Sequence, residues 1–188
     1  NVTAVNDLPT AADKTVTATE DTALVFAVAD FGFSDVDTSD QLQSITITTL
    51  SSTGTLTLDG STVAGDQTIS QADIAAGKLA FTPATNANGT GYDSFKFTVN
   101  DGVADSSASS TMTIDVTAVN DLPTASDNTV TVAEDTPHTF VVSNFGFSDV
   151  DSAAQLQSIA VTSLPSAGTL ALNGSTVTSG QSISRSDI

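Results

Sequence analysis

The chain has 188 residues, a formal net charge of −18 at pH 7 and no cysteine. A charge this negative repels phosphate backbones and anionic headgroups, so we expect no binding to nucleic acid or to a membrane surface. The lack of cysteine excludes disulfides and thiolate sites, and no apolar run approaches the ~18 residues of a membrane span, so we also expect no membrane insertion.

Short segments in which polar and apolar residues alternate follow one another along residues 1–119. Alternation with a period of two predicts β-strands, which we expect at 15–17, 23–28, 44–50, 55–58, 78–82, 94–99 and 111–117. Residues 58–63 have the pattern of a hairpin tip, and residues 70–77 predict one helical turn with Ser70 as its N-cap and Gly77 as its end. Seven short strands at this spacing favour an immunoglobulin-like β-sandwich.

Aspartate accounts for 20 of the 22 acidic residues, and Glu20 and Glu134 are the two glutamates. Aspartate favours turns and caps over helix interiors. The composition therefore predicts an all-β chain with acid-rich loops. Six phenylalanines occur at strand spacing and are expected in the core: Phe26, Phe31, Phe33, Phe81, Phe95 and Phe97. His138 has no nucleophile partner and is expected at the surface or at a strand edge.

The sequence repeats itself with an offset of 114 residues. Asn6-Asp7-Leu8-Pro9-Thr10 returns at 120–124, and residues 6–74 are identical to residues 120–188 at 43 of 69 positions. We therefore predict the tail of a preceding repeat at 1–5, a complete repeat at 6–119 and the first part of a second repeat at 120–188, within a natural protein that extends on both sides.

The second copy holds counterparts of the first four expected strands and is truncated after the fourth. Its sheets would have open edges, and open strand edges pair with other chains. We therefore expect that strands of a neighbouring molecule complete the second repeat, or that it packs differently from the first.

The acidic residues sort onto the two ends of the predicted sandwich, because successive strands alternate in direction. The end where the first strand begins is expected to collect Asn6, Asp7, Asp35, Asp37 and Asp101. The opposite end, at the junction with the next repeat, is expected to collect Glu20, Asp21, Asp93, Asn120, Asp121, Asp149 and Asp151.

Carboxylates gathered in a small volume repel one another unless a cation lies among them. Calcium takes 6–8 oxygen ligands from carboxylates, amides and backbone carbonyls, whereas magnesium prefers octahedral geometry and keeps its waters. We therefore predict Ca2+ at the junction, and weaker Ca2+ binding at the start of the first repeat. Solvated loops and ordinary linker chemistry before proline are the alternatives for these motifs.

Four motifs carry a resemblance: the Asn-Asp-x-Pro linker, Glu-Asp-Thr after the first strand, Asp-x-Asp after the second and Asn100-Asp101-Gly102. In their order and spacing they resemble the cadherin-like tandem repeats of large bacterial surface adhesins, including those exported with RTX-type C-termini. The resemblance implies Greek-key sandwiches, location at the bacterial cell surface and calcium at the junctions. Its implied ligands are Glu20, Asp93, Asn120, Asp121, Asp149 and Asp151. The linker is shorter than in cadherins, so we expect fewer ions per junction.

We therefore predict a non-catalytic, extracellular calcium-binding extender of a large adhesin, with the neighbouring repeats of the same chain as its first partners. Two alternatives stay open. One is a module that recognises surface glycans or sister adhesin modules through an exposed strand edge, and the other is an accessory module of a carbohydrate-active enzyme. A pure spacer retains no glycan and does not self-associate with calcium, whereas a recognition module does one of these.

Overall fold

The computed structural model describes residues 5–37, 39–151 and 153–188. The chain forms two compact units, of which one ends at Val119 and the other comprises Asn120–Ile188. Nearly all of its regular structure is β, with short helical turns between strands. No helix within the described ranges is long and apolar enough to cross a membrane.

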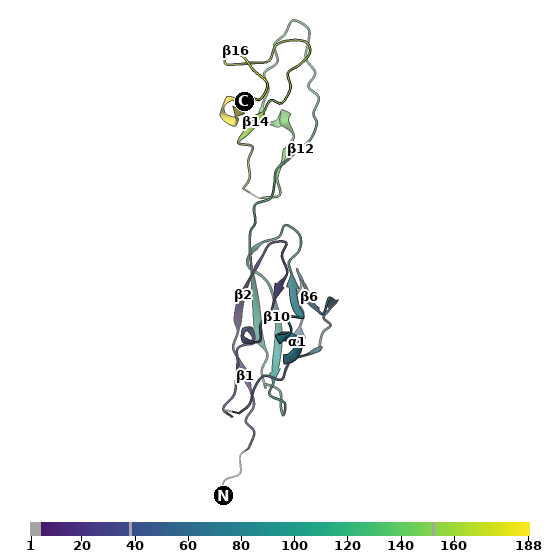
Figure 1. Ribbon diagram of the computed structural model, residues 1–188, viewed down its shortest axis with the longest axis vertical. Helices are drawn as coiled ribbons and strands as arrows, with labels where there is room; N and C mark the ends of the chain where they lie inside the picture. The colour runs from purple at the N-terminus through teal and green to yellow at the C-terminus, as the bar shows by residue number, and fades with distance from the viewer. Residues whose placement is uncertain (1–4, 38, 152) are drawn as a thin grey trace. The chain divides into compact units, whose positions relative to one another are not determined.

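The first unit is a β-sandwich (Figure 1). The larger sheet has five strands, in the order β2 (Lys14–Thr19), β11 (Ser110–Thr117), β10 (Gly89–Asn100), β5 (Ser44–Thr49) and β8 (Thr68–Ser70). The smaller sheet has four, in the order β3 (Leu24–Val25), β9 (Leu79–Thr82), β6 (Thr55–Leu58) and β7 (Ser61–Thr62). The all-β, immunoglobulin-like fold class predicted from the sequence is therefore confirmed.

The first strand of the sandwich is divided into two parts. β1 (Thr10–Ala11) pairs antiparallel with β4 (Phe33–Ser34), and β2 then runs parallel to β11 along the larger sheet. The expected strand at 23–28 is too long, because only β3 is extended and a 3-10 turn, η1 (Val28–Phe31), follows it. The Asp30 carboxylate accepts a hydrogen bond from the Ala27 amide at 2.8 Å and so favours this turn over a continued strand.

The predicted helical turn is present as α1 (Gln71–Ala75). Ser70 is its N-cap, since the Ser70 hydroxyl accepts a hydrogen bond from the Asp73 amide at 3.1 Å. Gly77, with φ of 72°, follows the turn in the left-handed region that glycine tolerates. β8, which immediately precedes α1, was not expected as a strand because three residues are too few for a periodic signal.

Phenylalanine side chains form the centre of the core between the two sheets. Five of the six expected phenylalanines are buried and Phe33 packs against them half-buried, so the predicted core is confirmed. The rings of Phe26 and Phe95 lie edge to face at 5.6 Å, and those of Phe31 and Phe97 at 5.1 Å. This geometry adds about 0.5–1.5 kcal/mol per pair beyond the apolar area buried.

The described residues of the second unit, 120–151 and 153–188, form three separate two-stranded ladders. They are β12 (Thr124–Ala125) with β13 (Phe147–Ser148), β14 (Ser158–Ala160) with β17 (Ser182–Ser184), and β15 (Ala171–Leu172) with β16 (Ser175–Thr176). Two 3-10 turns, η2 (Val142–Phe145) and η3 (Arg185–Asp187), complete it. At the offset of 114 these ladders are the counterparts of β1–β4, β5–β8 and β6–β7 in the first unit.

The counterparts of β2 and β3, at 128–133 and 138–139, are not strands in the second unit. In the first unit β2 pairs with β11, and β3 pairs with β9. Both partners lie within residues 75–119, which have no counterpart in this chain. The second repeat therefore packs differently from the first, one of the two outcomes that the sequence predicts, while completion by another molecule stays a prediction.

Candidate metal site

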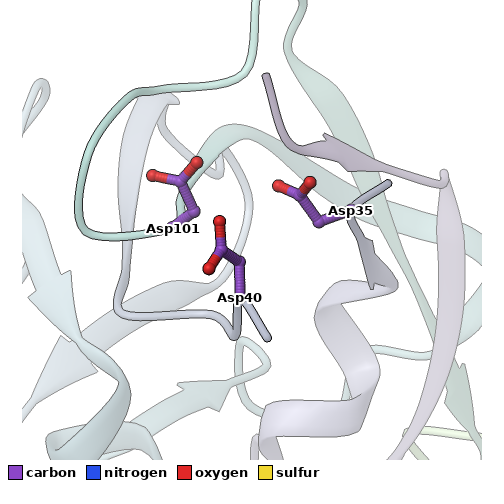
Figure 2. A group of neighbouring side chains, drawn as sticks. All are labelled: Asp35, Asp40 and Asp101. Carbon is purple, nitrogen blue, oxygen red and sulfur yellow. The ribbon is translucent and has the colours of Figure 1, made fainter. Parts of the chain in front are cut away.

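Three carboxylates converge where two loops meet at one end of the first unit. Asp35 follows β4 directly, Asp101 follows β10 directly, and Asp40 lies in the segment before β5. One carboxylate oxygen from each lies within 4.8 Å of the others, and Figure 2 shows the three groups gathered around a shared space. Asp35 and Asp101 were predicted to meet, whereas Asp40 was not singled out. The spacing Asp-x-Asp-x-x-Asp at 35–40 is the signal that would have found it.

Asp101 is held rigidly by its own loop. Its Oδ1 accepts hydrogen bonds from the amides of Val103 at 2.6 Å and Ala104 at 2.7 Å, and its Oδ2 accepts one from Asn6 Nδ2 at 3.1 Å. The Ala104 and Val103 amides are the main cause that lowers the pKa of Asp101 below its ordinary value. The Asp101 carboxylate is therefore ionised at neutral pH.

Asp35 has one satisfied oxygen and one that lacks a partner. Its Oδ1 accepts a hydrogen bond from the Asp37 amide at 2.9 Å. Its Oδ2 is buried and has no hydrogen-bond partner among the described residues, which leave out Thr38. A buried acceptor left unsatisfied costs about 1–3 kcal/mol, and more when it is charged. A cation among the three carboxylates would remove this cost.

The other residues predicted for this end lie in the same hydrogen-bonded network. Asn6 contacts Asp101, and the Asp7 amide donates to Asp37 Oδ2 at 2.9 Å. Asn6 Nδ2 also donates to the Asp7 carbonyl at 2.7 Å, and the Asp37 amide donates to Asp35 Oδ1, so these bonds connect all five predicted residues in one chain. The structure therefore brings Asn6, Asp7, Asp35, Asp37 and Asp101 together, as the loop argument predicts.

The donor set suits a hard cation. It offers three carboxylates, whose oxygens are the ligands that calcium prefers. The chain has four lysine and arginine residues, and among the described residues the one ion pair is between Lys78 and Asp73, outside this cluster. The residues therefore fit Ca2+ better than a transition metal.

At the other end of the first unit, Glu20 is a buried carboxylate with two polar partners. It is 3% exposed, its Oε1 accepts from Asn88 Nδ2 at 3.1 Å, and its Oε2 accepts from the Val119 amide at 2.8 Å. Glu20 therefore ties the end of the first repeat to the turn before β10. Asp21 has φ of 55° and accepts from the Asn86 amide at 2.9 Å. Asn86 and Asn88 were missed by the sequence argument, although Asn-x-Asn-Gly is a turn signal.

Asp93 uses its carboxylate to shape a neighbouring turn. Its two oxygens accept hydrogen bonds from four backbone amides at 2.8–3.0 Å, those of Ser52, Thr53, Gly54 and Ser94. Burial alone would raise the pKa of Asp93, but these amides outweigh it, so the pKa lies below its ordinary value. Because a carboxylate has about four lone-pair positions, a cation would have to displace an amide here. The metal role of Asp93 stays a prediction.

The predicted ligands of the second unit repeat the arrangement at the start of the first. The Asp121 amide donates to Asp151 Oδ2 at 3.0 Å, and the Asp151 amide donates to Asp149 Oδ1 at 3.0 Å. Asn120 Nδ2 donates to the Asp121 carbonyl at 2.6 Å. Of the three clustered carboxylates, only Asp35 has a counterpart here, Asp149: Ala154 stands at the position of Asp40, and this chain does not include the position that matches Asp101. That these residues share calcium with the first repeat stays a prediction.

The comparisons with known proteins agree with the sandwich. A family model described as "Bacterial Ig domain" matches residues 6–117, which include both sheets and the three-carboxylate cluster. No curated protein matches the chain. Because the family match covers more than half of the 188 residues, the chain belongs to the bacterial Ig domain family.

Proposed function

We propose that the chain is an extracellular surface module of a large bacterial adhesin, in which calcium at the ends of cadherin-like repeats stiffens the array. The observation that carries this proposal is the buried, unpartnered Asp35 Oδ2 within a group of three carboxylates. Membership of the bacterial Ig domain family supports a surface location. The tandem repeat supports an extender role, since an array gains length from each copy.

At the start of the first repeat, Asp35, Asp40 and Asp101 are the direct ligands in this proposal, with water completing the coordination. The ion neutralises their mutual repulsion and joins the loop at 35–43 to the loop after β10. Asn6 and Asp7 are bonded to Asp101 and Asp37, so ordering these loops also orders the chain that enters the repeat. Calcium at 100-fold its Kd would stabilise the folded repeat by about 2.7 kcal/mol.

The proposal extends to the ligands expected between repeats. Glu20 and Asp21 of the first repeat, with Asn120, Asp121, Asp149 and Asp151 of the second, are proposed to share calcium, and Asp93 is the weakest member because backbone amides occupy its oxygens. Replacing Asp121 or Asp149 with alanine should weaken calcium binding in calorimetric titrations while the first repeat stays folded. Unchanged titrations for both variants would rule out this ligand set.

A thermal melt with matched variants tests the first-repeat site. The parent chain should melt at a higher temperature in millimolar calcium than in EDTA, and magnesium should have a smaller effect. Asp40→Asn and Asp35→Asn should lose most of the calcium shift. Asp66→Asn is the matched control, because it removes the same charge from an exposed position of the first repeat outside the cluster. Equal calcium shifts in all three variants would overturn the site.

The extender role predicts a change in stiffness that the ion controls. Small-angle scattering of the chain should give a longer maximum dimension and a narrower distance distribution with calcium than with EDTA. Identical scattering in both conditions would leave calcium as a local stabiliser and would contradict the role of the ion in stiffening the array.

A further inference from the structure

The first and the last long strand of the first repeat are neighbours in the larger sheet. They are β2 and β11, which pair in parallel from Lys14 with Met112 to Thr19 with Thr117. The chain therefore enters β2 at one end of this ladder and leaves β11 at the opposite end. Tension between the chain before β2 and the chain after β11 would pull the two strands in opposite directions along their length.

A ladder resists this direction of pulling more than any other. Each residue of β2 has a partner in β11, and the hydrogen bonds of a parallel ladder are evenly spaced. When the strands slide past each other, these bonds share the load and have to break nearly together. When two strands are drawn apart from one end, the bonds break one after another. Tension on the chain thus loads the β2–β11 ladder in shear.

Side chains add hydrogen bonds at the end of the ladder where β2 begins. Asp13 Oδ1 accepts a hydrogen bond from the Thr111 amide at 2.7 Å, and the Ser110 hydroxyl donates to the Ala11 carbonyl at 2.7 Å. Ser110 is buried, so water has little access to its bond. Both bonds join the segment of β2 to the segment of β11, and they therefore add to the resistance against sliding.

A second set of bonds lies at the end where β11 finishes. The Glu20 amide donates to the Thr117 carbonyl at 2.9 Å, and the Thr117 hydroxyl donates to the Ala18 carbonyl at 3.1 Å. The buried Glu20 carboxylate accepts a hydrogen bond from the amide of Val119, the last residue of the first unit, at 2.8 Å. This bond lies at the point where tension from the following residues reaches the repeat.

The inner side of the ladder is closed to water. Ala18 of β2, and Ile114 and Val116 of β11, are buried in the core between the sheets. Water competes for backbone groups when a ladder opens, and a hydrogen bond in low-dielectric surroundings is stronger than one in water. The core therefore supports the ladder along the length over which its strands lie side by side.

The weakest part of the same path is the ladder that precedes β2. β1 pairs with β4 through Thr10 and Ala11 alone, so few bonds oppose a pull on the residues before β1. Tension should therefore release β1 first, in a small step, and should then act on the β2–β11 ladder.

We propose that the first repeat is a load-bearing module, which a shear clamp keeps folded under tension. The clamp consists of the β2–β11 ladder and the hydrogen bonds of Asp13, Ser110, Thr117 and Glu20 at its two ends. An extender needs length and stiffness, whereas this role requires slow unfolding under force, which is a separate property. The clamp is made of protein groups alone, so the inference does not depend on calcium.

Single-molecule force spectroscopy of the full chain in EDTA tests the clamp by comparing two directions of pulling. The chain has no cysteine, so two introduced cysteines define the points of attachment. Val5→Cys with Leu122→Cys, both at exposed positions, loads β2 and β11 from opposite ends. Val5→Cys with Val103→Cys draws the same strands apart from one end, because Val103 is exposed in the loop before β11.

The opposite-end pair should unfold the first repeat at a several-fold higher force than the one-end pair, at the same loading rate. Rupture of the clamp should release residues 14–117, which span about 350 Å when extended. A smaller, earlier step should mark the release of β1. Equal unfolding forces in the two directions would overturn the proposal, because a ladder that is not loaded in shear has no reason to resist one direction more than the other.

Matched substitutions test the bonds at the ends of the clamp. Asp13→Ala removes the bond to the Thr111 amide, and under opposite-end pulling it should raise the unfolding rate at constant force about tenfold. Asp127→Ala is the matched control, since Asp127 stands at the position of Asp13 in the second repeat, outside the loaded segment. Glu20→Gln should act in the same direction as Asp13→Ala from the other end. Rates equal to that of the control for both variants would overturn the role of these side chains.

Discussion

The two repeats share 43 of 69 aligned residues, yet they reach different structures. The first buries an apolar core of eighteen residues between two sheets. Among the described residues of the second, Val177 and Ile183 are the buried hydrophobic side chains. Nearly the same local sequence thus produces a sandwich in one place and three isolated ladders in the other.

Whether a segment of the second unit forms a strand depends on whether its pairing partner is present in the chain. Ladders whose two strands both lie within the shared residues survive in the second unit, as β14 with β17 and β15 with β16 do. Segments whose partners lie in 75–119 lose their strand character, as residues 128–133 do. A strand stabilises itself through cross-strand pairs and one buried face, so removal of a distant partner removes the strand.

The largest expected effect comes from removing a core phenylalanine in one repeat and its counterpart in the other. Phe26→Ala should destabilise the first repeat by about 3–5 kcal/mol, because it leaves a cavity between Phe31 and Phe95. The matched variant Phe140→Ala should cost less than about 1 kcal/mol, since its ring is partly exposed. Hydrogen exchange resolved by peptide measures each unit separately. Similar losses for both variants would mean that the second repeat has a core of its own.

The next effect concerns the turn that Asp93 organises. Asp93→Asn should cost about 3 kcal/mol, because it removes the charge that four backbone amides hydrogen bond and turns an amide donor toward them. Gly54 makes this turn sensitive, since a Cβ there would lie 2.2 Å from Phe81 Cζ. Urea unfolding of the parent and the variant measures the loss, and a change below about 0.5 kcal/mol would contradict this role of Asp93.

Acid should weaken the first repeat through the same carboxylates. The pKa values of Asp93 and Asp101 are lowered in the folded state from 3.8. These two carboxylates therefore contribute their full stability at a pH well above their pKa in the unfolded state. This contribution is lost as the pH falls from about 5 through their pKa values in the folded state. Urea midpoints between pH 6 and pH 2 should decrease in this window, and Asp93→Asn should flatten the curve. A slope unchanged by Asp93→Asn would exclude this residue as a source.

A smaller loss of stability should distinguish substitution of Glu20 from substitution of Glu134. Glu20→Gln should cost about 1–2 kcal/mol, because it places an amide group against the donors Asn88 Nδ2 and the Val119 amide. Glu134→Gln should stay within about 0.5 kcal/mol, since Glu134 is exposed. Thermal unfolding of each variant checks the pair. Exchange at Val119 should quicken in Glu20→Gln alone, and an unchanged rate there would contradict the tie between Glu20 and the end of the repeat.

The smallest effect concerns the ion pair beside α1. The Lys78 hydrogen bond is the main cause that lowers the pKa of Asp73, but the Lys78 and Asp73 side chains are 42% and 34% exposed, so water screens the pair. Lys78→Ala should therefore lower the melting temperature only slightly, and less at high salt. A loss as large as that of Glu20→Gln would show that this exposed pair contributes more than its surroundings imply.

Much of the first unit could be predicted from the sequence. Thr55–Leu58 was predicted without error, and Ser44–Thr49 within one residue, because apolar residues alternate there with polar ones. The point at which the strand expected at 23–28 ends could not be predicted, because the pattern of Ala23–Val28 is compatible with a continuous strand. The hydrogen bond from the Ala27 amide to the Asp30 carboxylate stabilises a turn there instead. Asp40 was missed although the spacing Asp-x-Asp-x-x-Asp at 35–40 places it near Asp35, because a loop acid carries no strand periodicity.

The sequence by itself determined the tandem organisation, the all-β character and the loops in which acids gather, since these depend on repetition, periodicity and turn chemistry along the chain. Only the tertiary structure decided which carboxylates meet and which stay apart. In it, backbone amides hydrogen bond the Asp93 carboxylate, and the Asp40 carboxylate lies close to those of Asp35 and Asp101. The Phe140 side chain is partly exposed, whereas that of Phe26 is buried. Each of these outcomes depends on segments far apart in the sequence, and contacts of that kind form only when both partners are present and the sheets close over them.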